Sequence, residues 1–268
     1  EHRVEAQLAM RCAAGVVDVM LGRAATSRKV LHLVRHGQAA HNVRAEPRRT
    51  AGCSMEEFIA LMKADDVFDA PLTEVGLEQA RVAAESLRGL AVSRLDLVVA
   101  SPLTRALETA DLLFPPTALS HSCGHLCLDF FRERAGILQS CQRRRASELA
   151  SELPHWDFDF LAEEDAALSE ELEEAAACTQ RAYEGLCLLW ARPEVNIAVV
   201  AHGGVLAHLL SDHAEVKAVP ALRRRFQNCE VRSCLMTRMP PEGESDRIAA
   251  EGAFSLQPLP ADAVESLL

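Results

Sequence analysis

Three short apolar runs constrain the fold of this chain more than any other feature of its sequence. They are Val30 to Val34, Leu95 to Ala100 and Asn196 to Ala201, and each is rich in β-branched or aliphatic residues. Their apolar residues are largely continuous rather than alternating, which is typical of strands that are buried on both faces, as parallel strands are. We therefore predict three strands of a mostly parallel sheet.

Helical patterns lie between these runs. From Thr73 to Leu90, apolar residues recur at spacings of three and four. A second helix is predicted to begin at Ser101, with Pro102 at its first helical position, and a third to follow Gly203-Gly204 and run from Val205 to Leu210. Strands that alternate with helices indicate an α/β fold, a doubly wound sheet covered by helices in three layers, α/β/α.

The remaining segments set the predicted domain boundaries. A Glu- and Ala-rich helical stretch from Ala162 to Trp190, together with Arg143 to Leu149, indicates a helical capping insertion over about residues 136–189. We predict an N-terminal extension over residues 1–28, a single domain over 29–238 that contains this insertion, and a C-terminal tail over 239–268 without strong periodicity.

The charge of the chain limits its partners. Its 39 Asp and Glu residues outnumber 28 Lys and Arg residues, which gives a formal charge of −11, and all but three of the cations are arginines. A polyanion such as DNA is repelled by this charge, so we expect no nucleic-acid partner. A small phosphorylated substrate fits better, because arginine binds phosphate through two parallel hydrogen bonds.

Cysteine use and hydropathy indicate the environment. Nine cysteines without framework spacing are typical of reduced thiols. The most apolar N-terminal stretch, Ala6 to Ala25, is interrupted by Arg11, Asp18 and Arg23 and is too polar to span a bilayer. We therefore expect a soluble protein of a reducing compartment, the cytoplasm or an organelle, with no membrane partner.

A cation or an imidazole follows each of the three predicted strands. Arg35 and His36 follow the first, Arg105 ends the SPLTR segment after the second, and His202 follows the third. Because ligands of open α/β sheets bind outside the carboxyl ends of the strands, these side chains are expected to meet at one edge. Two histidines and two arginines supply a nucleophile and positive groups for a transferring phosphoryl group, without a metal ion.

Five longer motifs surround these residues and extend over most of the chain. In order they are LVRHGQAAHN (Leu33 to Asn42), DAPLTEVGLEQA (Asp69 to Ala80), VVASPLTRALETA (Val98 to Ala110), FRERAG (Phe131 to Gly136) and VVAHGG (Val199 to Gly204). Together they resemble the histidine phosphatase, or phosphoglycerate mutase-like, superfamily. The segments SCQRRRASELASELP, WDFDF and FQNCEVRSCLM are similar to its branch of uncharacterised phosphoglycerate mutase-like proteins from plants, algae and fungi.

The resemblance implies how the reaction would run. His36 would attack phosphorus through an unprotonated ring nitrogen and form a phosphohistidine. Glu133 would protonate the leaving alcohol and then activate water. The nearby carboxylates Glu108 and Asp129 are alternatives to Glu133, and only the family resemblance chooses between them.

The resemblance also implies which residues hold the phosphoryl group. Arg35, Arg105 and a charged His202 would bind its oxygens and belong to the catalytic set with His36 and Glu133. Asn42 and Gly203 would complete the phosphate-binding site. No cofactor is expected.

Two further clusters allow alternative interpretations. His121 to Cys127 holds two histidines and two cysteines, which suggests a zinc site, but the ligands are too closely spaced for a structural site, so we expect incidental thiols and no metal. Two arginine clusters are expected to lie on exposed faces that pair with Glu. Alternatively, one or two arginines of the first cluster bind a second anionic group of the substrate, which would then be a sugar phosphate, a phosphoglycerate or a phosphocarboxylate. The two clusters are Arg132, Arg134 and Arg143 to Arg145, and Arg223 to Arg225.

The sequence thus favours a metal-independent phosphomonoester hydrolase that acts on a small phosphorylated metabolite through a phosphohistidine. The first alternative is a phosphoglycerate mutase, although the segment AAHNVRAEPRRTAGCSM lacks the Trp-Asn pair and the Gly-Trp loop of the cofactor-dependent mutases. The second is a catalytically weak phosphate-binding or scaffolding protein, although every expected core position is filled.

Overall fold

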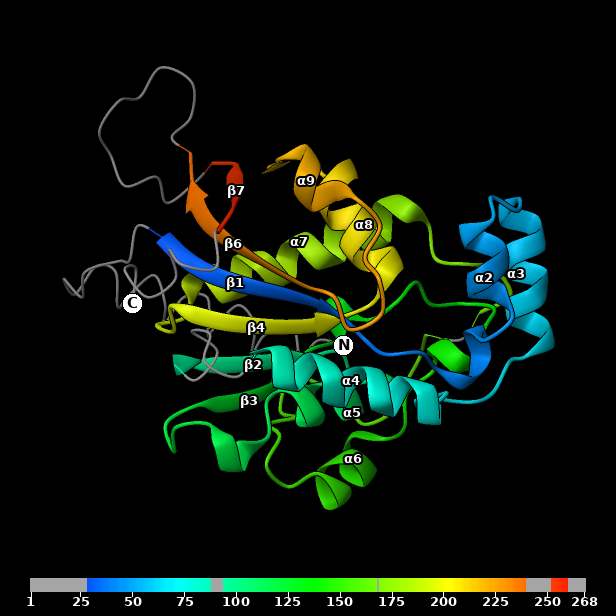
Figure 1. The fold of residues 1–268 in the computed structure, drawn as a ribbon, viewed down its shortest axis with the longest axis horizontal. Helices are drawn as coiled ribbons and strands as arrows, with labels where there is room; N and C mark the ends of the chain where they lie inside the picture. Colours follow the sequence, from blue (N-terminus) through cyan, green and yellow to red (C-terminus); the bar gives the residue numbers. More distant parts are fainter. Residues whose placement is uncertain (1–27, 88–93, 168, 240–251, 260–268) are drawn as a thin grey trace.

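A seven-stranded sheet forms the middle of the fold in the computed structural model, which describes residues 28–87, 94–167, 169–239 and 252–259 (Figure 1). The strand order is β3-β2-β4-β1-β6-β7-β5. The four strands from β3 to β1 are parallel, whereas β6 is antiparallel to both of its neighbours. The strands are β1 (Arg28–Arg35), β2 (Leu97–Ala100), β3 (Gly124–Cys127), β4 (Asn196–Ala201), β5 (Val216–Ala218), β6 (Val231–Arg238) and β7 (Phe254–Pro258).

Helices cover both faces of this sheet, which confirms the predicted α/β fold. Because successive strand residues point to opposite faces, Leu33 of β1 packs in the core beneath α7 and α8, while Val34 packs beneath α4 and α5. The sheet is therefore the middle of three layers, α/β/α. The helices are α2 (Ala45–Thr50), α3 (Met55–Ala64), α4 (Glu74–Leu87), α5 (Thr104–Leu113), α6 (Ala146–Glu152), α7 (Ala175–Ala191), α8 (Gly203–Asp212) and α9 (Pro220–Arg223).

The predicted start of the second helix at Ser101 is wrong. Helix α5 begins at Thr104, with Leu103 at the N-cap position. The Ser101 side chain instead forms a hydrogen bond with His202, and the backbone N–H of Thr104 donates to the carboxylate of Asp69. The side chain of Asp69, 35 residues away in the sequence, therefore accepts a hydrogen bond from the start of α5, as the side chain of an N-cap residue usually does.

The long helix predicted from Ala162 to Trp190 is also only partly present. Its first part is irregular, because the Arg143 guanidinium binds the backbone carbonyls of Ala162 and Glu164, at 2.6 and 3.2 Å, that a helix would use for its own hydrogen bonds. Its second part is α7, which packs on the sheet through Leu186 and Leu189. This helix is a layer of the α/β domain and not part of a cap.

Several regular segments were not expected from the sequence, among them β5, β6 and α9. Helices α2 and α3 lie beyond the carboxyl ends of β1 and β4 (Figure 1). Strand β7 comes from the predicted C-terminal tail and lies between β6 and β5, with Phe254 and Leu256 buried. The predicted N-terminal extension lies outside the described residues as far as residue 27, including the stretch Ala6 to Ala25.

Two observations concern the described residues as a set. None of their helices combines the length and the apolar character needed to cross a membrane. The eight cysteines among them are not joined by disulfide bonds.

Two glycines bring the loop after β1 against helix α4. A Cβ atom on Gly37 would lie 2.7 Å from the carbonyl oxygen of Gly76, and one on Gly76 would lie 2.1 Å from the carbonyl oxygen of Gln38. No side chain fits in either place, so the loop that carries His36 rests on the main chain of α4.

Candidate active site

The carboxyl ends of β1, β2 and β4 bring four of the predicted site residues together. His36 directly follows β1, His202 follows β4 as the N-cap residue of α8, and Arg105 lies in the first turn of α5. The rings of His36 and His202 meet edge to face with their centroids 4.9 Å apart. Arg35 and His36 are buried, and Arg105 and His202 are 0 % exposed.

The His36 ring is oriented for attack by one nitrogen. Its Nδ1 lies 2.6 Å from the carbonyl oxygen of Gly37, to which it donates, so Nε2 carries the lone pair. Burial lowers the pKa of His36 well below its usual value, and the charges of Arg105, Arg35 and His41 lower it further. The ring is therefore neutral near pH 7, as a nucleophile must be.

Only some of the guanidinium N–H groups of Arg35 and Arg105 have a hydrogen-bond partner in the protein. Arg35 donates through Nη1 to Phe226 O at 2.8 Å and through Nη2 to Glu46 Oε1 at 2.6 Å, and Arg105 donates through Nη1 to Ser140 O at 2.6 Å. Arg35 Nε and Arg105 Nε and Nη2 are buried and make no hydrogen bond with any described residue. Buried charged donors are costly without a partner, so they favour an anionic ligand.

The Nε2 atom of His202 shares a hydrogen bond with Ser101 Oγ at 2.8 Å. Its buried Nδ1 makes no hydrogen bond within the described part of the chain. Burial lowers its pKa well below the usual value, and so do Arg105, His36, His41 and Arg35. The expectation of a charged His202 is therefore wrong for the protein by itself. A phosphate dianion would act in the opposite direction and raise the pKa of this ring.

The carboxylate of Glu133 lies at the N-terminus of α8, next to His202. Its Oε2 accepts from Gly204 N at 3.0 Å, and its Oε1 accepts from Val205 N at 3.1 Å and Arg134 N at 3.0 Å. A Cβ atom on Gly204 would lie 2.2 Å from Oε1, so the carboxylate can approach only because this residue is glycine.

The two alternative carboxylates have other partners. Glu108 accepts a hydrogen bond from Leu72 N at 2.7 Å, and Asp129 lies 3.6 Å from the guanidinium of Arg132 and 3.4 Å from that of Arg143. Among the three, Glu133 is the one that contacts the helix beginning at His202.

The last two predicted site residues, Gly203 and Asn42, contact other parts of the protein. Gly203 lies against Arg35, since a Cβ atom there would be 3.1 Å from Arg35 Nε, so it leaves room for the guanidinium. Asn42 is buried, and its Oδ1 accepts from Ala39 N at 3.2 Å within its own loop. Its contact with phosphate remains a prediction.

Three residues of the site were missed by the sequence reasoning. Ser101 orients His202, and buried His41 lies close enough to influence both other imidazoles. Thr109 donates to Arg105 O at 2.7 Å and accepts from Gly37 N at 3.1 Å, so it ties α5 to the His36 loop. Ser101 directly follows β2, and this position at a strand end was the one available signal.

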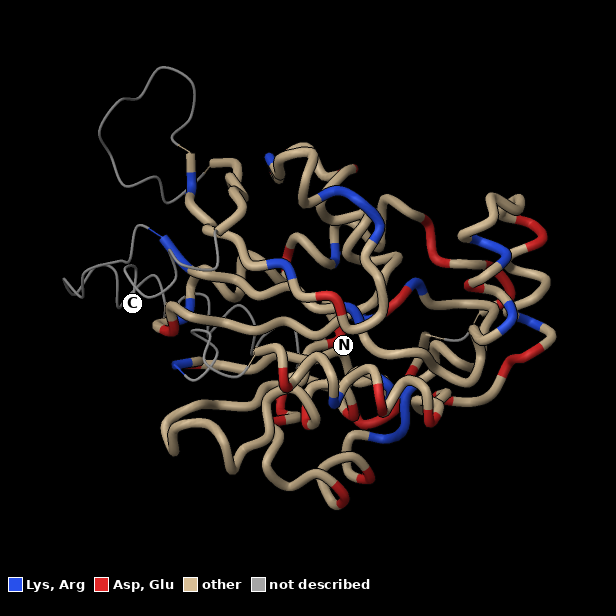
Figure 2. Tube along the Cα trace, viewed as in Figure 1, with Lys and Arg blue, Asp and Glu red and all other residues tan. Residues whose placement is uncertain are grey.

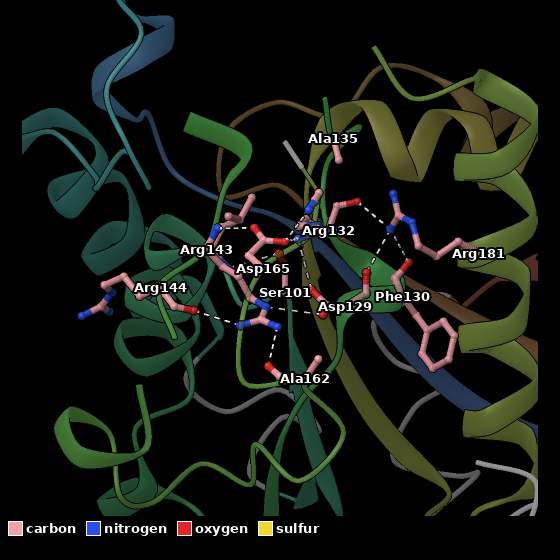
Figure 3. Close-up of polar contacts among 12 residues, drawn as sticks. Ser101, Asp129, Phe130, Arg132, Ala135, Arg143, Arg144, Ala162, Asp165 and Arg181 are labelled. Carbon is pink, nitrogen blue, oxygen red and sulfur yellow. Dashed lines mark hydrogen bonds and ion pairs between the residues drawn. The ribbon is translucent and has the colours of Figure 1, made fainter. Parts of the chain in front are cut away.

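The first arginine cluster is engaged within the protein (Figure 3). Arg132 binds Asp165 at 2.8 Å, and Arg143, which is buried rather than exposed, binds Asp129 and several backbone carbonyls. Arg181 of α7 donates to the carbonyls of Asp129, Phe130 and Arg132, each at 3.0 Å, and so fixes the turn that precedes Glu133. The expectation of an exposed face that pairs with Glu is therefore wrong for Arg132 and Arg143, which are buried and bind aspartates and backbone carbonyls. In the second cluster, Arg225 pairs with Glu46.

The closely spaced histidines and cysteines do not gather into a metal site in the structure. His125 of β3 packs edge to face on the rings of His155 and Trp156, 5.5 and 5.2 Å away. Within the described ranges, no group of three His, Cys, Asp or Glu side chains is arranged to hold a metal ion.

The buried imidazoles make a prediction about stability. Burial lowers the pKa of His36, His41 and His202 in the folded protein, so below about pH 6.5 the unfolded chain binds more protons than the folded one. We expect the free energy of unfolding to fall between pH 7.5 and 5.5, by up to about 1.4 kcal/mol per pH unit for each ring. Urea denaturation at several pH values measures this slope. The variant His41→Gln should reduce it, and an unchanged slope would contradict the assignment.

Comparison with known proteins gives a family match and similar plant proteins. A family model described as the histidine phosphatase superfamily (branch 1) matches residues 62–243. Phosphoglycerate mutase-like protein 1 of Arabidopsis thaliana is 31% identical over 255 residues, which cover 78% of this chain and 81% of that protein. A second phosphoglycerate mutase-like protein of the same plant is 29% identical over 241 residues, covering 78% and 84%.

A solved structure shares the fold. The ecdysone phosphate phosphatase from Bombix mori has a TM-score of 0.51 and 17% sequence identity, over 84% of this chain and 97% of that one.

Proposed function

The chain belongs to the histidine phosphatase superfamily, and we propose that it hydrolyses a small phosphomonoester through a phosphohistidine on His36, without a metal ion. One observation carries this proposal. The neutral His36 ring, with Nε2 as its lone-pair nitrogen, lies among buried N–H groups of Arg35 and Arg105 that have no partner in the described protein. Such a site suits a dianionic phosphoryl group that is attacked in line.

The reaction has two steps in this proposal. His36 Nε2 attacks phosphorus, the P–O bond to the alcohol breaks, and the carboxyl of Glu133 gives its proton to the leaving oxygen. The resulting Glu133 carboxylate then takes a proton from water, which attacks the phosphohistidine and releases inorganic phosphate. Arg35 and Arg105 stabilise the equatorial oxygens throughout, together with His202, whose buried Nδ1 has no hydrogen-bond partner among the described residues.

The experiment that tests the proposal is phosphate release from a panel of phosphomonoesters in the presence of EDTA. Rapid quenching with ³²P-labelled substrate should trap an acid-labile phosphoenzyme on a histidine. Turnover that requires an added divalent ion, or turnover without a trapped phosphoenzyme, would contradict the mechanism. Phosphate release at only a trace level across the whole panel would favour a phosphate-binding or scaffolding role instead.

The Arabidopsis relatives are named phosphoglycerate mutase-like proteins, which supports a second candidate function. This function is the transfer of a phosphoryl group between two positions of a phosphoglycerate. It uses the same phosphohistidine but returns the group to the sugar acid. Incubation with 3-phosphoglycerate and 2,3-bisphosphoglycerate separates the two candidates. Isomerisation without net phosphate release would favour the mutase.

A small substrate also fits the distribution of charge. Acidic residues lie along the outer helices (Figure 2), and Glu74, Glu78 and Glu85 are exposed on α4, whereas Arg35 and Arg105 are buried beside His36. This arrangement supports a compact phosphorylated metabolite as the substrate and disfavours a nucleic acid.

Replacement of Glu133 by Gln should separate its role from that of the alternative carboxylates. We expect kcat to fall by about 10²–10³-fold with little change in KM, because the amide cannot transfer the proton. The loss should be smaller for p-nitrophenyl phosphate, whose leaving group needs no proton. Glu108→Gln is the matched control, since Glu108 contacts Leu72 and not α8. A larger loss in Glu108→Gln than in Glu133→Gln would reverse the assignment.

A further inference from the structure

The backbone at Asp69 is strained. Its φ of 43° lies in the left-handed region, and among the non-glycine residues that the structure describes only Cys229 shares a positive φ. Asp69 is also buried. A buried non-glycine residue in this conformation is usually held there by its surroundings for a functional reason.

Both oxygens of the Asp69 carboxylate bind the residue before Arg105. Oδ1 accepts from Thr104 N at 2.8 Å, and Oδ2 accepts from Thr104 Oγ1 at 2.6 Å. Oδ2 also accepts from Arg144 Nε at 3.2 Å. Because Thr104 is the first residue of α5, this carboxylate fixes the turn of helix from which the Arg105 side chain starts.

The same segment holds the other end of the Arg105 side chain. Arg105 Nη1 donates to Ser140 O at 2.6 Å. The turn that carries this carbonyl is bound by Asp66, whose two oxygens accept from Gln139 N and Ser140 N, each at 2.8 Å. In addition, Asp69 N donates to Gln139 O at 3.2 Å.

We propose that Asp69 and Asp66 are positioning residues for Arg105, an inference that rests on the proposed phosphatase function. Neither carboxylate is placed to touch a phosphoryl group, since each is used on backbone or side-chain donors of its neighbours. They act through Thr104 and Ser140. The Nε and Nη2 atoms of Arg105 have no partner among the described residues, so the direction in which they point depends on these two attachments. A misplacement of about 1 Å in such a group can cost about 10²-fold in rate.

The test uses variants that separate the carboxylate from the strained backbone. Asp69→Gly removes the carboxylate and tolerates the positive φ, while Asp69→Asn retains one acceptor oxygen. We expect Asp69→Gly to lower kcat/KM by about 10–100-fold and to raise the Kd for inorganic phosphate, measured by titration calorimetry, at least about tenfold. Asp69→Asn and Asp66→Ala should show smaller losses in both quantities.

Asp65→Ala is the matched control, because Asp65 lies in the same segment but pairs with Arg44 at the surface. Its phosphate affinity and kcat/KM should stay within about twofold of the wild type. A purely structural role would lower the urea midpoint of Asp69→Gly while leaving the phosphate Kd and the kcat/KM of the folded enzyme unchanged, and that result would overturn the proposal.

A double variant gives the decisive comparison. If Asp69 acts through Arg105, then Asp69→Gly should have little further effect on phosphate affinity when Arg105 is already Met. An equal loss in both backgrounds would overturn the proposal. A wild type that binds phosphate but releases none from esters would contradict the proposed function alone, because the effect of Asp69→Gly on phosphate Kd would still be measured. A wild type without phosphate affinity would contradict both.

Discussion

Replacement of His36 by Ala is expected to reduce phosphate release by at least about 10⁴-fold, the size of effect seen when a covalent nucleophile is removed. The other groups of the site have binding or proton-transfer roles in the proposed mechanism. The Nε2 atom of His202 is engaged with Ser101, and Glu133 is bound to the start of α8. Assays with EDTA on the purified variant measure the loss, and phosphoenzyme trapping should fail in parallel.

The histidine at position 208 provides the control for this variant. His208 lies on α8 and pairs with Asp212 near the surface, so His208→Ala should retain full turnover. Phosphate binding to His36→Ala should persist, because the arginine N–H groups remain in place. Full turnover in His36→Ala, or a phosphohistidine trapped at another position, would show that the nucleophile is wrongly assigned.

Replacement of Arg105 by Met should have opposite effects on activity and stability. Loss of a preorganised donor to the transition state should lower kcat by about 10²–10³-fold. The guanidinium is fully buried and donates to Ser140 O, while its Nε and Nη2 atoms have no hydrogen-bond partner among the described residues. A side chain of similar volume without a charge should therefore raise the free energy of unfolding, by about 1–4 kcal/mol in comparable cases.

Urea denaturation and steady-state kinetics on the same preparation measure both effects. Arg81→Met on α4 is the control, since Arg81 is exposed and pairs weakly with Glu78 at 3.4 Å. It should change neither quantity appreciably. A loss of stability in Arg105→Met would mean that the side chain serves the fold and not the site.

The sequence predicted the strand ends well because strand burial and chain order are local properties. Continuous apolar runs identify β1 and β4, and the residue after each run necessarily lies at the carboxyl edge. This is why His36 and His202 could be placed together before the structure was known. The neutral state of His202 could not be predicted in the same way, because it depends on burial beside Arg105 and Arg35.

The two wrong helix predictions have a common physical cause. In each, a side chain that is distant in the sequence binds a backbone group at the place where a helix was predicted. Asp69 binds the N–H of Thr104, so α5 starts two residues later than the Ser101-Pro102 signal suggests. Arg143 binds carbonyls in the Ala162 region, so the helical composition there does not produce a helix. Helix propensity and capping signals describe neighbouring residues only, so they could not predict these two long-range contacts.

The two imidazoles are as far apart as two neighbouring strands. Strands β1 and β4 are adjacent and parallel, Arg35 is paired with Ala201, and His36 and His202 are the next residues of each strand. Their ring centroids are 4.9 Å apart, and hydrogen-bonded strands are about 4.8 Å apart in any sheet. The adjacent strands, with Arg35 paired to Ala201, thus place the two histidines side by side at the same edge of the sheet. Loops and helices around the site could then diverge to accept new alcohols while this spacing stays constant.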